Sequence, residues 1–257
     1  MKTQSFFIAS GLRIIGLLLL ASTANAAELR VLCANGMQSV MTTLAPQFEQ
    51  LSGHKLLITY ATGGVAVQRA AEGEDVDLVI APQPGIDALV KGGKALREKV
   101  VPIASTGISV AVRKGAPKPD ISSPESFKRA LLAAKSITYL DPKEGGASGI
   151  HFAKVLERLA ISDEMKAKTV FAHHTDAVGT LVAKGEAELG VVQFQLLFAV
   201  QGIEVIGPLP GDLQNLTVFA AVVMARTKVD VASTALTHYL RSPEASASIR
   251  AKGMESF

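Results

Sequence analysis

Three short glycine-containing turns carry the residues best suited to holding a ligand. Each turn follows an apolar stretch typical of a buried strand and precedes a stretch whose apolar residues recur at helical spacing. The first turn of a helix has backbone N–H groups without intrahelical partners and carries the positive end of the helix dipole. Such a turn can bind an anion without a charged side chain. The candidate ligand-binding residues of the three turns are Asn35, Gly36 and Met37, then Thr62, Gly63 and Gly64, and finally Ala147, Ser148 and Gly149.

These turns also have simpler explanations. Asn35 or Thr62 could serve only as an ordinary helix cap, and the glycines could only allow a left-handed turn. We favour the binding hypothesis because a strand, a polar turn and a helix recur together along the chain. The recurrence predicts that several helix starts meet at one ligand.

His151 is the candidate catalytic residue if the protein is an enzyme. It lies shortly after the start of a predicted helix, where its ring could bind a carboxylate or move a proton near neutral pH. A histidine that faces solvent is the simpler explanation. Asp141 and Glu144 could act as paired carboxylates, although a solvated turn explains them better. The sequence contains no P-loop, dinucleotide-binding fingerprint or Ser-His-Asp order, and we expect no cofactor.

The run His173-His174-Thr175-Asp176 raises the question of a metal site. Neighbouring residues of an extended segment point to opposite sides, and zinc would need further ligands that no spacing provides. We therefore expect no metal site. Thr175 and Asp176 instead have the pattern of another helix start, immediately before Ala177.

Residues 1–26 have the pattern of an export signal. Lys2 and Arg13 precede an apolar core at 14–21, and Ala24-Asn25-Ala26 offers a small-x-small cleavage pattern. The core is too short to span a bilayer. We expect cleavage after Ala26 and export to the periplasm.

The charge balance of the remaining chain excludes strongly polyanionic partners. Of the 26 Lys and Arg residues two lie in the signal, which leaves 24 against 23 Asp and Glu residues. Such a balance gives no reason to expect nucleic acid or acidic lipid as a partner. The one cysteine, Cys33, excludes an internal disulfide, and a buried strand cysteine is a better interpretation than a nucleophile.

Apolar segments of strand length alternate with helical patterns, which is typical of an α/β protein with largely parallel sheets. A proline-rich linker near 117–124 separates two such series, so we expect two lobes with the turns lining one cleft between them. The expected first lobe spans 27–105 plus 216–257, the second spans 106–215, and hinge strands lie near 103–112 and 216–224.

Several short motifs follow one another in a characteristic order over nearly the whole mature chain. They are Val31-Leu32-Cys33-Ala34, residues 48–54, residues 75–81, Asp141-Pro142, Ser148-Gly149-Ile150 and residues 184–192. With these motifs the chain resembles the molybdate-binding family of ABC transporter components. The resemblance implies a two-lobed type II periplasmic-binding fold, in which each lobe is a mostly parallel sheet flanked by helices and the ligand lies between the lobes.

The same resemblance implies a ligand set that departs from the family pattern. In the family, serine hydroxyls and backbone N–H groups of the first two turns hold the oxyanion. Here Gly36 occupies the first serine position, and glycines follow Thr62 in the second turn. Ser148 occupies an alanine position, Gln193 replaces a tyrosine, and Ala177 falls at a further ligand position.

These differences disfavour molybdate. A hydrogen bond to a charged oxygen contributes about 1.5–3 kcal/mol, so the loss of two hydroxyl donors should weaken the binding of a tetrahedral oxyanion. Glycines should enlarge the pocket, and Gln193 offers both a donor and an acceptor. A planar or branched organic anion, such as a di- or tricarboxylate, fits this change better.

The resemblance implies a monomer that captures a small anion by hinge closure and delivers it to an inner-membrane ABC permease. An alternative is an enzyme on the same scaffold. The segment Gly207-Pro208-Leu209-Pro210 resembles a divergent branch that includes aconitate isomerases, which interconvert trans- and cis-aconitate. In that case His151 is the candidate base. A binding protein that serves a sensor is a third possibility.

Overall fold

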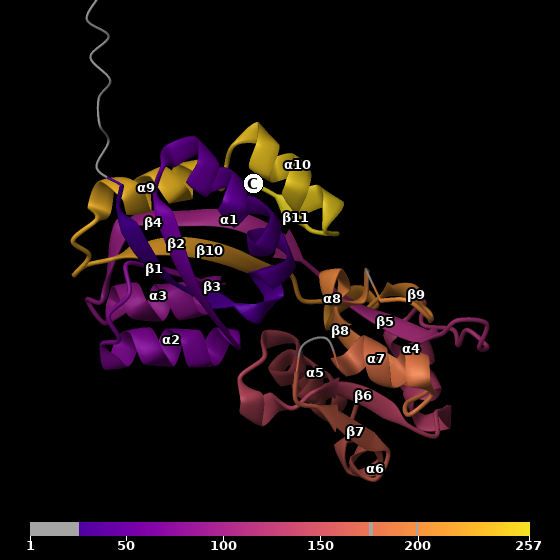
Figure 1. Cartoon of the computed structure of the whole chain (residues 1–257). Helices are drawn as coiled ribbons and strands as arrows, with labels where there is room; N and C mark the ends of the chain where they lie inside the picture. The colour runs from indigo at the N-terminus through magenta and orange to yellow at the C-terminus, as the bar shows by residue number, and fades with distance from the viewer. Residues whose placement is uncertain (1–25, 175–176, 199) are drawn as a thin grey trace, which may run out of the picture.

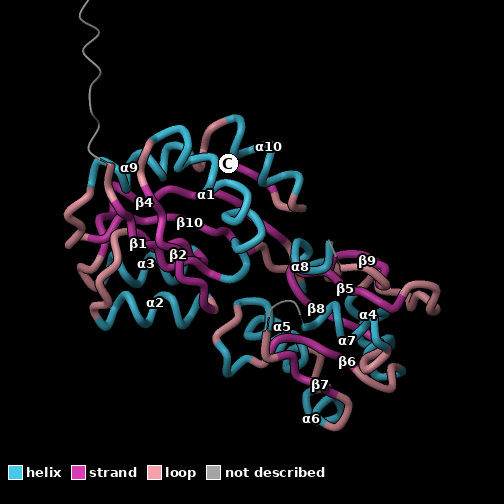
Figure 2. The backbone as a smooth tube through the Cα atoms, viewed as in Figure 1, coloured by secondary structure: helices cyan, strands magenta, loops and turns pink. Residues whose placement is uncertain are grey.

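The computed structural model describes residues 26–174, 177–198 and 200–257, shown as a cartoon in Figure 1 and as a tube in Figure 2. The predicted export signal lies outside the described residues except for Ala26, and the predicted helix start at Thr175 and Asp176 also lies outside them. None of the helices within these ranges has the length and apolarity needed to cross a membrane.

The N-terminal and C-terminal parts of the chain together form the first sheet. Its strands are β1 (Glu28–Ala34), β2 (Lys55–Ala61), β3 (Leu78–Pro82), β4 (Ala95–Thr106), β10 (Thr217–Met224) and β11 (Glu255–Ser256). They lie in the order β11-β4-β10-β3-β1-β2. Both ends of the described chain therefore belong to this lobe.

Helices cover both faces of the first sheet (Figure 1). The 3-10 helix η1 (Asn35–Met37) leads into α1 (Gln38–Ser52), which lies on one face with α9 (Asp230–Tyr239) and α10 (Pro243–Ala251). The opposite face is covered by α2 (Gly63–Glu72) and α3 (Gln83–Lys91). Glycine ends both α1 and α2, because Gly53 and Gly73 have φ of 74° and 99°, in the left-handed region.

The middle of the chain forms the second sheet and its helices (Figure 2). The strands are β5 (Ile108–Arg113), β6 (Ile137–Leu140), β7 (Thr169–Ala172), β8 (Leu189–Gln193) and β9 (Ile203–Pro208), in the order β7-β6-β8-β5-β9. One core packs α4 (Pro124–Ala133), α5 (Ala147–Arg158) and α6 (Ser162–Lys166) against the sheet. A second core packs α7 (Ala177–Lys184) and α8 (Phe194–Phe198) on the sheet. The 3-10 helices η2 (Pro142–Glu144) and η3 (Gly211–Leu213) lie in connections.

The prediction of mostly parallel sheets is wrong, since both sheets are mixed. Helical crossovers give the parallel pairs β1–β2, β1–β3, β6–β7 and β6–β8. However, β10 runs antiparallel to both β3 and β4, and β5 runs antiparallel to both β8 and β9. The physical reason is that β5 and β10 receive the chain directly from the other lobe, so no helical crossover sets their direction.

Two chain segments connect the lobes and lie side by side. The strand predicted at 103–112 is split, because β4 ends at Thr106 and β5 begins at Ile108. The side chain of Gln214, on the returning segment, accepts a hydrogen bond from the Ile108 N–H and donates one to the Ile108 carbonyl, both at 2.9 Å. One glutamine therefore ties the outgoing segment to the returning segment where the chain passes between the lobes.

Candidate ligand-binding site

A small cavity of about 20 Å³ lies where the two lobes meet. The residues that line it from the first lobe are Ala34, Asn35, Gly36, Thr62, Gly63, Pro82 and Phe219. The residues that line it from the second lobe are Leu140, Gly146, Ala147 and Gln193. The structure thus brings predicted residues of all three turns, together with Gln193, to one cavity.

Four helix starts converge on this cavity. The residues that precede η1, α2, α3 and α5 are Ala34, Thr62, Pro82 and Gly146, and all four line the cavity. None of these four fully described helix starts has an acidic residue in its first turn or a side-chain cap.

Two helices away from the cavity have side-chain caps. The side chains of Ser123 and Ser242 cap α4 and α10, and each of these helices has a glutamate in its first turn. Two other helices, α6 and α9, have no side-chain cap, but each has an acidic residue in its first turn. The four helix starts at the cavity have neither, so their backbone amides and positive dipole ends suit an anion there.

Two buried hydroxyls at this site have no hydrogen-bond partner among the described residues. They are Oγ1 of Thr62, which lines the cavity, and Oγ of Ser148 in the first turn of α5. A buried polar group without a partner costs about 1–3 kcal/mol. The Thr62 hydroxyl can recover this cost by donating to an anion in the cavity and so fits the predicted binding role, whereas Ser148 is not among the residues that line the cavity.

Two buried glutamines link the lobes beside the cavity. Nε2 of Gln193 donates to Oγ1 of Thr217 at 3.3 Å. Gln195, on α8, accepts a hydrogen bond from the Thr106 hydroxyl at 2.7 Å and donates one to the Gly36 carbonyl at 3.2 Å. Because Gln195 joins the second lobe to the first turn of the first lobe, it positions that turn.

The prediction that glycines enlarge the pocket is wrong at two positions. A Cβ on Gly36 would lie 2.6 Å from Cζ of Phe219, and a Cβ on Gly63 would lie 2.7 Å from Cδ of Pro82. The space that a serine would need is therefore filled by neighbouring side chains. These glycines allow close packing of the turns and do not widen the cavity.

Two further predicted glycines serve close approaches between backbone segments. The Gly64 N–H donates to the Gly145 carbonyl at 3.3 Å, across the two lobes. A Cβ on Gly149 would lie 2.2 Å from the Leu140 carbonyl oxygen, so α5 can start against β6 only with glycine there. Neither glycine is among the residues that line the cavity.

The remaining predicted site residues lie away from the cavity. Met37 is 0% exposed and belongs to the core of the first lobe. Ala177 packs against the core under α7. His151 lies on α5, and its Nε2 is 2.8 Å from the Leu213 carbonyl. A carbonyl can only accept, so this contact requires the Nε2–H form of the ring.

An open groove of about 640 Å³ adjoins the cavity and shares Asn35 with it. Polar side chains dominate its walls. The first lobe contributes Asn35, Gln38, Ser39, Thr42, Thr43 and Lys252, and the second lobe contributes His174, Gln195, Leu196 and Val200. The cavity lining holds no charged side chain among the described residues, whereas the groove adds the ammonium group of Lys252.

Cys33 lies next to the first turn but cannot act as a nucleophile. The side chain is fully buried, and desolvation raises the pKa of its thiol well above the ordinary value. The thiolate, which is the reactive form, is therefore absent at neutral pH.

The comparisons with known proteins agree with this architecture. The chain matches the bacterial extracellular solute-binding proteins over residues 29–255 and belongs to that family. It has the two-lobed type II periplasmic-binding fold. It is 34% identical over 252 residues to an aconitate isomerase from Pseudomonas sp, with 94% of each chain covered.

The chain is also similar to molybdate-binding proteins. It is 27% identical over 259 residues to the molybdate-binding protein ModA of Azotobacter vinelandii, with 97% of this chain and 98% of that protein covered. The solved Azotobacter vinelandii periplasmic molybdate-binding protein superposes with a TM-score of 0.71 at 21% identity, covering 88% of this chain and 98% of the other.

Sequence reasoning missed several residues that form the site. Pro82 follows a predicted strand and begins a polar turn, so the rule that found the other turns could have found it. Phe219 and Gln195 carried no such signal, because both reach the site only through tertiary packing.

Proposed function

We propose that this protein captures a small organic anion between its two lobes in the periplasm and delivers it to an inner-membrane ABC permease. The observation that carries the proposal is the convergence of four uncapped helix starts and an unpartnered Thr62 hydroxyl on one cavity. The predicted export signal, with cleavage after Ala26, supports the periplasmic location.

A di- or tricarboxylate is the ligand class that fits best. A cavity of about 20 Å³ holds little more than one water-sized group, so it suits one carboxylate oxygen and is too small for a whole organic anion. The adjoining groove takes the rest of the molecule, with Lys252 available to a second carboxylate. The similarity to an aconitate isomerase, whose name identifies a tricarboxylate substrate, supports this class.

The proposed mechanism is hinge closure between a first lobe of 27–105 plus 216–257 and a second lobe of 106–215. One wall of the cavity comes from each lobe, and the two connecting segments meet at Ile108 and Gln214. A ligand that contacts both walls stabilises the closed arrangement more than the open one and so shifts the population toward closure.

A second candidate function is isomerisation of aconitate. It is favoured by the 34% identity to the aconitate isomerase, against 27% to the molybdate-binding protein. In this reaction a base removes a proton from the methylene carbon and the double bond moves to that carbon. A proton then returns to the outer carbon of the former double bond, while the central carbon stays doubly bonded. His174, which lines the groove, is better placed for the transfer than His151, whose Nε2 bonds to Leu213.

One pair of measurements tests both candidates. Isothermal titration of the mature protein with trans-aconitate, citrate, molybdate and sulfate should show saturable binding of the tricarboxylates and weaker binding of the tetrahedral anions. Tight molybdate binding without carboxylate binding would overturn the ligand class. Incubation with trans-aconitate, followed by chromatography for cis-aconitate, separates capture from catalysis. Turnover that is lost in His174→Gln and kept in His151→Gln would establish the isomerase candidate.

A further inference from the structure

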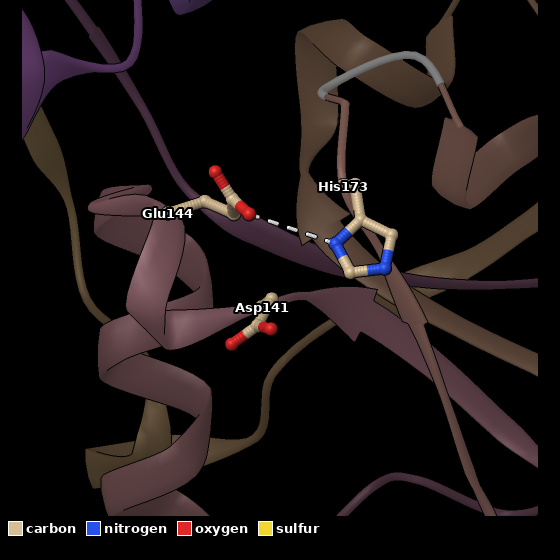
Figure 3. A group of neighbouring side chains, drawn as sticks. All are labelled: Asp141, Glu144 and His173. Atoms are coloured by element: carbon tan, nitrogen blue, oxygen red, sulfur yellow. Dashed lines mark ion pairs between the residues drawn. The ribbon is translucent and has the colours of Figure 1, made fainter.

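Three metal-ligating side chains of the second lobe lie close together at the ends of two adjacent strands, and the Glu144 carboxylate faces the His173 ring (Figure 3). The parallel pair β6–β7 ends at the register partners Leu140 and Ala172, and the Asp141 N–H bonds to the Ala172 carbonyl at 3.0 Å. Asp141 and His173 therefore leave neighbouring strands side by side. The spacing of His173 and His174 does not reveal this pairing, because Asp141 and His173 are neighbours only in the folded protein.

The short helix η2 brings a second carboxylate to the same place. The Asp141 carboxylate caps η2 by accepting from the Lys143 N–H at 2.9 Å, and the Glu144 N–H bonds to the Asp141 carbonyl at 3.0 Å. This tight turn places Oε1 of Glu144 3.6 Å from Nδ1 of His173. One donor atom from each of Asp141, Glu144 and His173 lies within 4.8 Å of the others.

We propose that Asp141, Glu144 and His173 form a binding site for a divalent transition-metal cation such as Zn²⁺. Two carboxylates and a neutral imidazole supply two oxygen donors, one nitrogen donor and two negative charges, which suits such a cation better than Mg²⁺ or Ca²⁺. Two ligands that share one zinc ion at about 2.1 Å lie roughly 3.4 Å apart in tetrahedral geometry, close to the observed Glu144–His173 separation. The side chains of His173 and Glu144 are 64% and 49% exposed, which leaves room for water at the remaining positions.

The site is connected to the wall of the ligand cavity. Glu144 directly precedes Gly145, whose carbonyl accepts the hydrogen bond from Gly64 of the other lobe. Gly146 and Ala147, the next residues, line the cavity. A cation that holds η2 in place therefore holds the loop that touches the first lobe. The metal site stands without the proposed function, and only its coupling to closure rests on that proposal.

Zinc titration of the full mature chain, freed of metal with EDTA and dialysed without any carboxylate, tests the site itself. We expect saturable binding with one ion per chain and a rise in Tm with ZnCl₂ but not with MgCl₂. His173→Gln and Glu144→Gln should each weaken zinc binding at least tenfold. Both residues are half-exposed or more, so the variants should fold, and circular dichroism checks this. Co²⁺ should give visible absorption bands that His173→Gln removes.

Matched histidine controls make the result decisive. His174→Gln removes the adjacent ring, and His238→Gln removes an exposed ring on α9. Both should bind zinc like the parent chain. Absence of saturable zinc binding, or binding that survives His173→Gln, overturns the site and leaves only an exposed ion pair. The coupling between the metal site and closure is then tested by titrating trans-aconitate with and without zinc. Zinc should raise the affinity of the parent chain for trans-aconitate and should not raise that of His173→Gln. If aconitate does not bind at all, the zinc titration still decides the metal site.

Discussion

The backbone N–H of Gly64 donates a hydrogen bond to the carbonyl of Gly145 across the interface between the lobes, at 3.3 Å. The two residues lie at the start of α2 and just after η2, next to residues that line the cavity from opposite sides. A Cβ on Gly64 would lie 3.2 Å from the same carbonyl oxygen, so an alanine there would require the two turns to separate by a few tenths of an ångström. It couples the ligand turns of the two lobes directly.

Gly64→Ala should weaken ligand binding without unfolding the protein. The added methyl group pushes the two turns apart, and loss of one hydrogen bond costs about 0.5–1.5 kcal/mol, or roughly a 2- to 10-fold rise in Kd. Isothermal titration with the tightest tricarboxylate measures the effect. Val65→Ala, at the exposed neighbouring position, is the control and should leave Kd unchanged. An unchanged Kd in Gly64→Ala would show that this contact is not part of closure.

Gly36→Ser should destabilise the first lobe and should not create a molybdate site. The new Cβ would lie 2.6 Å from Phe219, and overpacking of this kind costs about 1–3 kcal/mol. Urea denaturation should show the loss in the free energy of unfolding. The double variant with Phe219→Leu should recover part of it. A fully stable Gly36→Ser protein that gains molybdate affinity would mean that the turn can move away from Phe219.

Thr62→Val should separate ligand binding from stability. The Thr62 hydroxyl is buried without a partner among the described residues, so an isosteric methyl group should leave the free energy of unfolding unchanged or raise it by about 1 kcal/mol. Affinity for an anion should fall about 10- to 100-fold, because a hydrogen bond to a charged acceptor contributes about 1.5–3 kcal/mol. Thermal unfolding without ligand and titration with ligand measure the two effects. A lower Tm with unchanged affinity would contradict the binding role.

Asp120→Asn should change how stability depends on pH. Hydrogen bonds from the Ser122 hydroxyl and backbone N–H, together with the Ser126 hydroxyl, lower the pKa of Asp120 from 3.8 to about 2. A depressed pKa in the folded state adds stability above pH 3.8, and this stability is lost as the pH falls toward about 2. The parent chain should therefore be more stable than Asp120→Asn at pH 7, and the two should converge near pH 2. Denaturant titrations at several pH values measure this, and Ser122→Ala should show a smaller difference of the same sign.

Local patterns predicted the elements that have clear ends. The apolar runs Ile137–Leu140 and Leu189–Gln193 coincide with β6 and β8, and the helical pattern at Ala177–Lys184 coincides with α7. Two elements were missed because their composition misleads. The first half of β4 contains Arg97, Glu98 and Lys99, and α8 follows β8 directly, with no glycine or proline between them to mark a turn. The predicted parallel direction was wrong for β5 and β10, because their direction depends on the lobe from which the chain enters the sheet.

The sequence predicted only those parts of the candidate site that are formed by consecutive residues. A helix start is visible in sequence as a turn before a helical pattern, and three such turns proved to share one cavity. Side chains that reach the cavity from β10 or α8, namely Phe219 and Gln195, have no local pattern. The volume of the cavity was misjudged for the same reason, since a glycine leaves space only if nothing else fills it.

The pairing of Gln214 with Ile108 restricts how the molecule can move. If the two connecting segments were independent of each other, the lobes could move relative to each other in several directions. Ligands of many shapes would then be accepted. The Gln214 side chain bonds both the N–H and the carbonyl of Ile108, so the two connecting segments are held to each other. In the proposed closure this contact keeps the two connecting segments moving together, so a ligand is accepted only if its shape fits the closed arrangement of the lobes.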